Sequence, residues 1–201
     1  MALNYANNQS LSAITALPAS ISGGALTLLE TQTASSSATI DFTSNIDSTY
    51  DAYMFRWINI HPQTDDVDFK FQGSTDGGST YATSITSTWF EAYHDEADTG
   101  TSLAYNTGRD QGNGTALQFI NNKLGNDNDQ SSCGELILYS PSSTTFVKHF
   151  LIRTIRYSSN DFQAQQYCAG YFNTTSAINA IRFQMSSGNC DLRDIKLYGI
   201  S

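Results

Sequence analysis

The sequence predicts an all-β fold, an antiparallel β-sandwich of jelly-roll type with an extended N-terminal arm. Three observations lead to this prediction. There are 25 Ser, 22 Thr and 15 Asn among the 201 residues, and these side chains favour turns and strand surfaces over helix interiors. Apolar and polar residues alternate in several short segments, which is the period of a half-buried strand. No window of about a dozen residues carries the apolar stripe of a helix.

The first 24 residues differ from the rest of the chain. They are small, polar and uncharged, and they end in Pro18 and Gly23-Gly24. Such a segment is typical of an extended arm that leads into a domain. The remaining length suits one domain. We therefore predict an arm over residues 1–24 and a single β-sandwich domain over residues 25–201.

Strands are expected wherever alternating or apolar segments lie between turn signals. Alternation is clearest at 38–42 and 67–71. Further strands are predicted at 25–31, 50–61, 80–93, 101–107, 115–121, 134–140, 145–157, 162–173, 177–186 and 190–200. Turn sequences such as Asp76-Gly77-Gly78-Ser79 and Asn113-Gly114 separate them. Ten to twelve short strands without an internal repeat indicate a sandwich, of the jelly-roll kind.

Two of these segments are apolar on both faces. In 50–61 the residues Tyr53, Phe55 and Trp57 share one face, and the opposite face carries Ala52, Met54, Ile58 and Ile60. The segment 145–157 shows the same pattern. Either a second layer or a subunit interface must cover the extra apolar face. We favour the interface, and we expect Tyr53, Phe55 and Trp57 to join the subunits of a homo-oligomer.

Composition excludes several classes of function. The net charge of −9 lacks the basic footprint of a nucleic-acid-binding protein. No apolar run approaches the length of a membrane span, and the first residues do not resemble a secretion signal. Cys133, Cys168 and Cys190 lack a C-x-x-C spacing, so free thiols are expected, with one disulfide and a leftover thiol as the alternative. Phosphate-binding loops are absent, so no cofactor is predicted.

No catalytic constellation can be assembled from the sequence. There is no G-x-S-x-G motif, and only His61, His94 and His149 are available as a base. Acidic loops at 65–66, 76, 94–98 and 127–129 carry the hard oxygen ligands that calcium prefers. The same Asp residues are also typical turn caps, and we take capping as the main interpretation. The sequence predicts a protein that is not an enzyme.

One aromatic cluster suggests a binding surface. Trp89, Phe90, Tyr93 and His94 lie close to the end of a predicted strand. Aromatic rings beside polar groups are typical of sugar sites, because the ring stacks on the sugar and the polar groups bind its hydroxyls. These four residues are our candidates for glycan contact. The alternative is that the rings pack in the core or between subunits.

Three segments give the chain a family resemblance: NNQSLSAITALP near the start, VDFKFQGSTDGGSTY in the middle and IRFQMSSGNCDLRDIKLYGIS at the end. With them the chain resembles uncharacterised virion proteins of tailed phages that infect marine bacteria. The last segment is also similar to the final hairpin of lectin-like jelly rolls. The resemblance implies a capsid decoration or tail fibre protein without catalysis, and it carries no functional residue over to this chain.

The expected role follows from these observations together. We expect a virion structural protein, made in the cytoplasm of the bacterial host and displayed on the virion surface. Its expected partners are further copies of itself, with a trimer as the form common for phage appendages, and other virion proteins that the arm contacts. The alternative function is a carbohydrate-binding module that recognises a host-surface glycan during host attachment.

Overall fold

The structure is a computed structural model that describes residues 25–191 and 193–200. These residues form an all-β chain without a helix, as the sequence predicts. The described part accordingly contains no helix that could cross a membrane. The predicted arm over residues 1–24 lies outside the described residues.

Twelve strands follow one another in the described part of the chain. In order they are β1 (Leu26–Ala34), β2 (Ile40–Phe42), β3 (Ala52–Ile60), β4 (Val67–Ser74), β5 (Ile85–Asp95), β6 (Thr101–Tyr105), β7 (Gln118–Leu124), β8 (Ser132–Tyr139), β9 (Lys148–Tyr157), β10 (Phe162–Phe172), β11 (Ala180–Met185) and β12 (Arg193–Ile200). Each overlaps a range predicted from the sequence. The largest difference is at β5, which begins at Ile85 rather than at residue 80.

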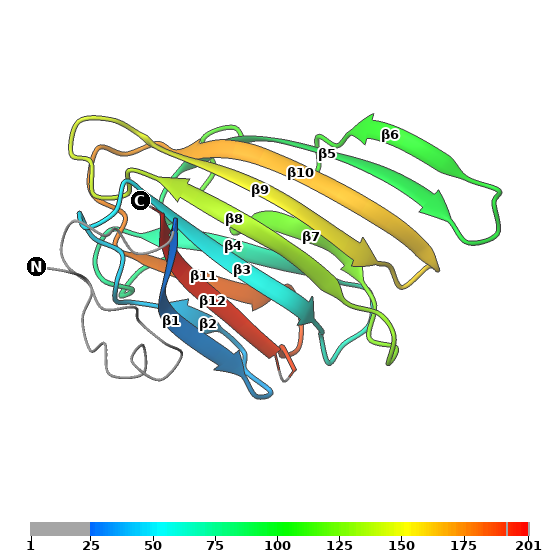
Figure 1. The fold of residues 1–201 in the computed structure, drawn as a ribbon. Coiled ribbons are helices and arrows are strands. Elements are labelled where there is room, and N and C mark those ends of the chain that lie inside the picture. The colour runs from blue at the N-terminus through cyan, green and yellow to red at the C-terminus, as the bar shows by residue number, and fades with distance from the viewer. Residues whose placement is uncertain (1–24, 192, 201) are drawn as a thin grey trace, which may run out of the picture.

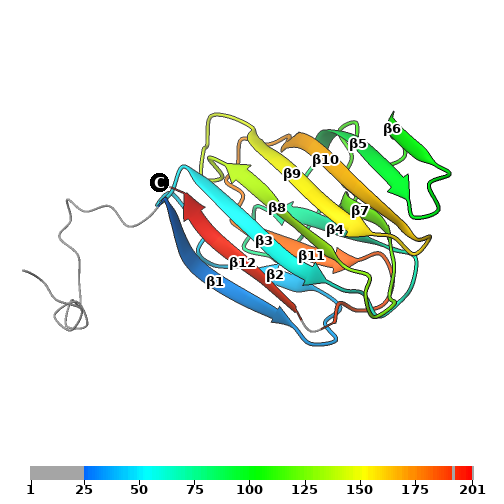
Figure 2. The ribbon, with the colours of Figure 1, turned by 45° about the vertical axis from the view of Figure 1, so that its right-hand side comes forward.

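The strands form two antiparallel sheets (Figure 1). The large sheet has eight strands in the order β1-β12-β3-β8-β9-β10-β5-β6, and the small sheet has four in the order β2-β11-β4-β7. Early strands pair with late ones, β1 with β12 and β2 with β11. Further along the chain β3 pairs with β8 and β4 with β7. Figure 2 shows how β9, β10, β5 and β6 extend the large sheet away from β1.

Aromatic rings from both sheets meet around Phe183 of β11. The centroid of its ring lies 5.4 Å from that of Phe55 on β3 and 5.9 Å from that of Phe69 on β4. Trp57 and Phe71 also contact this ring. Because the rings come from facing sides of two sheets, the core is that of a β-sandwich.

The subunit interface predicted at Tyr53, Phe55 and Trp57 is wrong. All three side chains are buried in the core of a single chain, where the small sheet covers them. The Tyr53 hydroxyl donates to Asp47 Oδ1 at 2.9 Å, and Trp57 Nε1 donates to Ser132 Oγ at 3.3 Å. Of the two alternatives, a second layer is the one that covers this face.

The opposite face of the large sheet stays partly apolar towards solvent. On β9, Phe150 and Ile152 are buried, whereas Leu151 and Ile155 on the opposite face are exposed. On β3 the outward residue Ile58 is 58% exposed. The extra apolar face that the sequence indicates is therefore real, and it is the outer face of the large sheet.

Candidate functional site

The four residues predicted to contact a glycan lie on β5, and strand alternation divides them between two faces. Trp89 is completely buried in the core, so the prediction that it contacts a glycan is wrong. Tyr93 points to the same side, and its ring packs 5.0 Å from that of Phe162. Phe90 and His94 lie one and five residues after Trp89. Because these spacings are odd, both side chains point to the opposite, outer face of the strand.

Phe90 belongs to an apolar patch at the end of the large sheet. Its ring stacks on Tyr167 of β10 with centroids 5.1 Å apart and planes at 16°. On β6, Tyr105 is the cross-strand partner of Phe90, and Leu103 is the partner of Ala92. Leu103 is 74% exposed and Tyr105 is 52% exposed. We call Phe90, Leu103, Tyr105 and Tyr167 the hairpin patch, after the β5–β6 hairpin.

The acidic loop at 94–98 is held by hydrogen bonds within its own turn. His94 Nε2 lies 3.0 Å from Asp98 Oδ1. Asp95 Oδ1 accepts hydrogen bonds from the backbone N–H groups of Thr99 and Gly100, and the bonds from Thr99 and Gly100 lower the pKa of Asp95. These contacts match the capping role that the sequence suggests. Across residues 25–191 and 193–200, no three His, Cys, Asp or Glu side chains are grouped so as to hold a metal ion.

The three cysteines are free thiols. Cys168 and Cys190 are buried, and burial raises the pKa of both, in the case of Cys190 to about 12. Because the thiolate is the reactive form, these two side chains act as small core residues.

His61 is the histidine that most resembles a catalytic base. Its Nδ1 lies 3.1 Å from Asp191 Oδ2, and it borders a hollow of about 440 Å³ that Ser35 and Ser36 also line. However, its Nε2 lies 3.1 Å from the carbonyl oxygen of Asp127. A base that activates serine needs this nitrogen turned towards the hydroxyl, so His61 ties two loops together instead.

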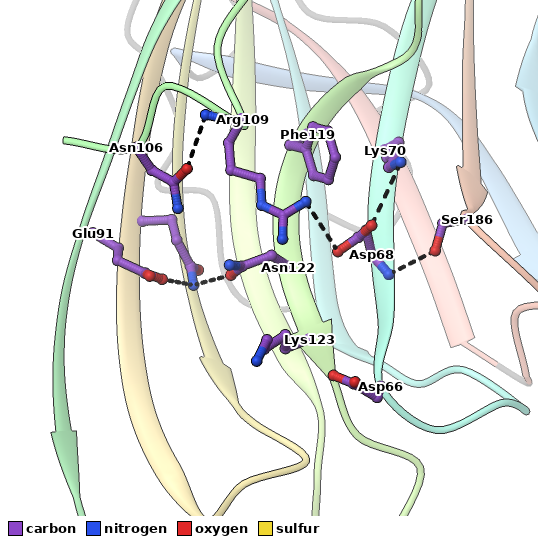
Figure 3. A network of polar contacts seen from close by, with 12 residues as sticks. Asp66, Asp68, Lys70, Glu91, Asn106, Arg109, Phe119, Asn122, Lys123 and Ser186 are labelled. Carbon is purple, nitrogen blue, oxygen red and sulfur yellow. Dashed lines mark hydrogen bonds and ion pairs between the residues drawn. The ribbon is translucent and has the colours of Figure 1, made fainter. Parts of the chain in front are cut away.

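A network of polar side chains, most of them buried, lies beside β7, one of the two edge strands of the small sheet. Arg156 of β9 binds both Glu91 of β5 and Asn122 of β7. These two partners are labelled in Figure 3. Arg156 Nη2 lies 2.9 Å from Asn122 Oδ1 and 3.5 Å from Glu91 Oε2. Burial lowers the pKa of Arg156 to about 10, and Glu91 opposes this shift. The guanidinium therefore stays charged near neutral pH and joins the large sheet to β7.

A second group of charges lies on the outer face of the small sheet, over β4 and β7. Asp68 forms ion pairs with Lys70 at 3.5 Å and with Arg109 at 4.0 Å (Figure 3). Both cations also approach the Phe119 ring, at 4.0 Å for Lys70 Nζ and 4.5 Å for the guanidinium carbon of Arg109. The Asp68 carboxylate and the face of the Phe119 ring together compensate the charges of Lys70 and Arg109. We therefore interpret this group as one that stabilises the fold.

The outer face of the large sheet is hollowed over β1, β3 and β12. The hollow measures about 490 Å³. It is lined by Thr33 of β1, by Arg56 and Ile58 of β3, and by Arg193, Asp194, Lys196 and Tyr198 of β12. We call these seven residues the cationic groove. A smaller hollow of about 200 Å³ adjoins it and shares Arg56 and Ile58.

A β-bulge shapes the wall between the two hollows. The register of β3 with β8 shifts between Trp57 and Ile60. Asn59 in the bulge has a φ of 56°, a conformation that Asn adopts more readily than most residues. The backbone N–H of Asn59 is held by Cys133 Sγ at 3.2 Å. Bulges bend a strand and redirect its side chains, which accounts for the prominent position of Ile58 beside the groove.

The described lining of each of the two hollows holds more cations than carboxylates. Each contains one carboxylate among its described lining residues, Asp194 in the groove and Glu135 in the smaller hollow. Glycoside hydrolysis uses two carboxylates that flank one bond. The lining instead combines cations, an aromatic ring and an apolar side chain.

Of the seven residues of the cationic groove, the sequence patterns pointed only to Ile58. In the sequence, Arg56 is the charged residue on the face of 50–61 that carries Ala52, Met54 and Ile58. Its neighbours Lys196 and Tyr198 come from the other end of the chain and join it only through the pairing of β3 with β12. Comparison with protein-family models, with curated proteins and with solved structures found no match to this chain.

Proposed function

We propose that this chain is a non-enzymatic structural protein of a bacteriophage virion, displayed on the particle as a capsid decoration or fibre subunit. The resemblance of its sequence to phage virion proteins first suggested this role. The structural observation that carries it is the hairpin patch, where Leu103 is 74% exposed. Contiguous exposed apolar side chains mark surfaces that other proteins cover, which suits a component of a larger particle.

The strand order supports a jelly-roll topology. In a jelly roll a long antiparallel hairpin is rolled up, so that pairs of strands are nested from the chain ends inwards. The pairs β1·β12, β2·β11, β3·β8 and β4·β7 are nested in this way and alternate between the two sheets. The hairpins β5–β6 and β9–β10 are then additions that widen the large sheet.

We place the proposed self-association at β6. This strand forms one edge of the large sheet, and its sequence TSLAY has neither charge nor proline. Proteins commonly protect edge strands with Lys, Pro or bulges, because an open edge pairs with other strands. A homo-oligomer with closed symmetry, such as a trimer, would cover this edge. The predicted contact of residues 1–24 with other virion proteins remains part of the proposal.

Carbohydrate binding is the second candidate function, and the cationic groove favours it. A volume of about 490 Å³ falls in the range of small-ligand sites. The groove also offers the Tyr198 ring together with polar side chains. A protein on the virion surface with such a groove would attach the particle to a host-surface glycan.

Mass spectrometry of gradient-purified particles of the phage that encodes this chain tests the virion role. We expect the protein in stoichiometric amounts, and gold-labelled antibody on intact particles should then distinguish head from tail. Absence from purified particles would refute the virion role. Glycan binding is tested separately, by exposing the purified protein to a glycan array, where a purely structural protein gives no reproducible preference.

A further inference from the structure

Two cations face one another in the groove. Arg56 on β3 and Lys196 on β12 are direct cross-strand partners, and both line the hollow of about 490 Å³. Like charges directly opposite one another on neighbouring strands destabilise a sheet. This arrangement is notable because the chain contains 19 acidic residues and only 10 Lys and Arg.

The carboxylates beside this pair are engaged elsewhere. Glu135 is the other cross-strand partner of Arg56, but its Oε1 binds Arg153 Nη2 at 2.8 Å. Asp194 in the groove accepts a hydrogen bond from Thr33 Oγ1 at 2.7 Å. Within the described residues neither Arg56 nor Lys196 has an ion-pair partner, whereas five other cations do: Lys70, Arg109, Arg153, Arg156 and Arg182.

We propose that the cationic groove binds an anionic saccharide, a glycan whose sugar units carry a carboxylate or a sulfate group. This inference rests on the glycan-binding candidate above and names its ligand class. An anion seated between Arg56 and Lys196 would replace their repulsion by attraction to both. Guanidinium groups bind carboxylate and sulfate oxygens through two parallel hydrogen bonds.

The other lining residues distinguish a saccharide from a simple ion. The groove is far larger than an inorganic anion requires. The Tyr198 ring and the Ile58 side chain provide apolar surface for the face of a sugar ring. The hydrogen-bonded pair of Thr33 and Asp194 provides polar atoms for sugar hydroxyls.

Isothermal titration calorimetry with defined oligosaccharides tests the ligand class. The probes are an oligogalacturonate, a sulfated galactan oligosaccharide, the same galactan without sulfate, and inorganic sulfate. We expect one or both acidic oligosaccharides to bind, and the neutral galactan and inorganic sulfate to bind at least about tenfold more weakly. The affinity should also fall when NaCl is raised from about 50 to about 500 mM, because exposed charges are screened.

Variants locate the site. The double variant Arg56→Gln with Lys196→Gln should lower the affinity for the acidic oligosaccharide by about tenfold or more. Lys123→Gln removes the charge of an exposed residue of β7 in the small sheet and should leave the affinity within about twofold. Circular dichroism of each variant shows whether it is folded, and Tyr198→Ala provides a second, uncharged test of the same groove.

The outcomes separate this inference from the function on which it rests. Equal affinity for neutral and acidic oligosaccharides would overturn the anionic class and leave glycan binding intact. Binding of inorganic sulfate as tight as that of the saccharide would also overturn it. If no probe binds and the glycan array is negative as well, both fail. An affinity unchanged in the folded double variant would overturn the location.

Discussion

Arg182 of β11 and Asp41 of β2 form a bidentate ion pair, with Nε–Oδ1 and Nη2–Oδ2 distances of 2.8 and 2.7 Å. The two residues are cross-strand partners, and the guanidinium carbon lies 4.1 Å from the centre of the Tyr81 ring. These hydrogen bonds raise the pKa of Arg182. Because β2 has only three residues, this pair is a strong side-chain attachment for an edge strand of the small sheet.

Asp41→Asn should lower the free energy of unfolding by about 1 kcal/mol, because it removes one charge of a partly exposed, well-oriented pair. Urea denaturation measures the change. Tyr81→Phe is the control, since the Tyr81 hydroxyl is buried without a hydrogen-bond partner and its removal is expected to be neutral or stabilising. Equal losses in both variants would argue against the ion pair as the source of stability.

Phe183→Ala should lower the free energy of unfolding by about 3–5 kcal/mol. The side chain is buried between the sheets and contacts rings from both, so its loss leaves a cavity as well as less buried area. Phe90→Ala on the outer face should cost less than about 1 kcal/mol. Chemical denaturation of both variants gives the comparison. Similar losses would show that Phe183 does not sit at the centre of the core.

Acid should destabilise the protein partly through Asp76. Hydrogen bonds from Ser74 and Thr80 lower the pKa of Asp76 from 3.8 to about 2. A carboxylate with a lowered folded-state pKa contributes stability above its unfolded value, and this contribution is lost as the pH falls from about 4 to about 2. We expect the melting temperature to fall over this range, and to fall less in Asp76→Asn. An identical pH dependence in the variant would contradict the role of Asp76.

Lys196→Glu should separate stability from binding. It places a carboxylate opposite Arg56, so the free energy of unfolding should rise by about 0.2–1 kcal/mol, while the affinity for acidic oligosaccharides should fall. Lys123→Glu makes the same charge change outside the groove and should alter neither quantity by a comparable amount. Thermal denaturation and calorimetry measure the two effects. A loss of stability in Lys196→Glu would show that the two cations do not repel one another.

The proposed oligomer should depend on β6. Leu103→Lys adds a charge to the exposed edge of the large sheet, and we expect it to convert the oligomer into folded monomers. Light scattering at micromolar concentration measures the mass. Phe146→Lys is the control, because Phe146 is also highly exposed but lies outside the hairpin patch. A wild-type protein that is already a soluble monomer would refute self-association altogether.

The sequence by itself determined the class of fold and the approximate place of every strand in the described chain. Both properties are local, because the period of two and the turn residues act over a few neighbouring positions. The capping Asp residues were identifiable for the same reason. Alternation assigned Tyr53, Phe55 and Trp57 correctly to one face. It was wrong for Ile60, which it placed on the opposite face, because the bulge between Trp57 and Ile60 shifts the alternation and Ile60 is buried in the core.

Which of two apolar faces lies inside was decided only by the tertiary structure. Both faces of β3 are apolar in sequence, and the position of the small sheet alone buries Tyr53 and leaves Ile58 outside. Trp89 is likewise buried in the core, so it is not part of the surface predicted to contact a glycan. The cationic groove is likewise non-local: Arg56 and Lys196 meet because β3 pairs with β12. Pairing between strands far apart in the chain depends on the packing of the whole sandwich, and no local pattern encodes it.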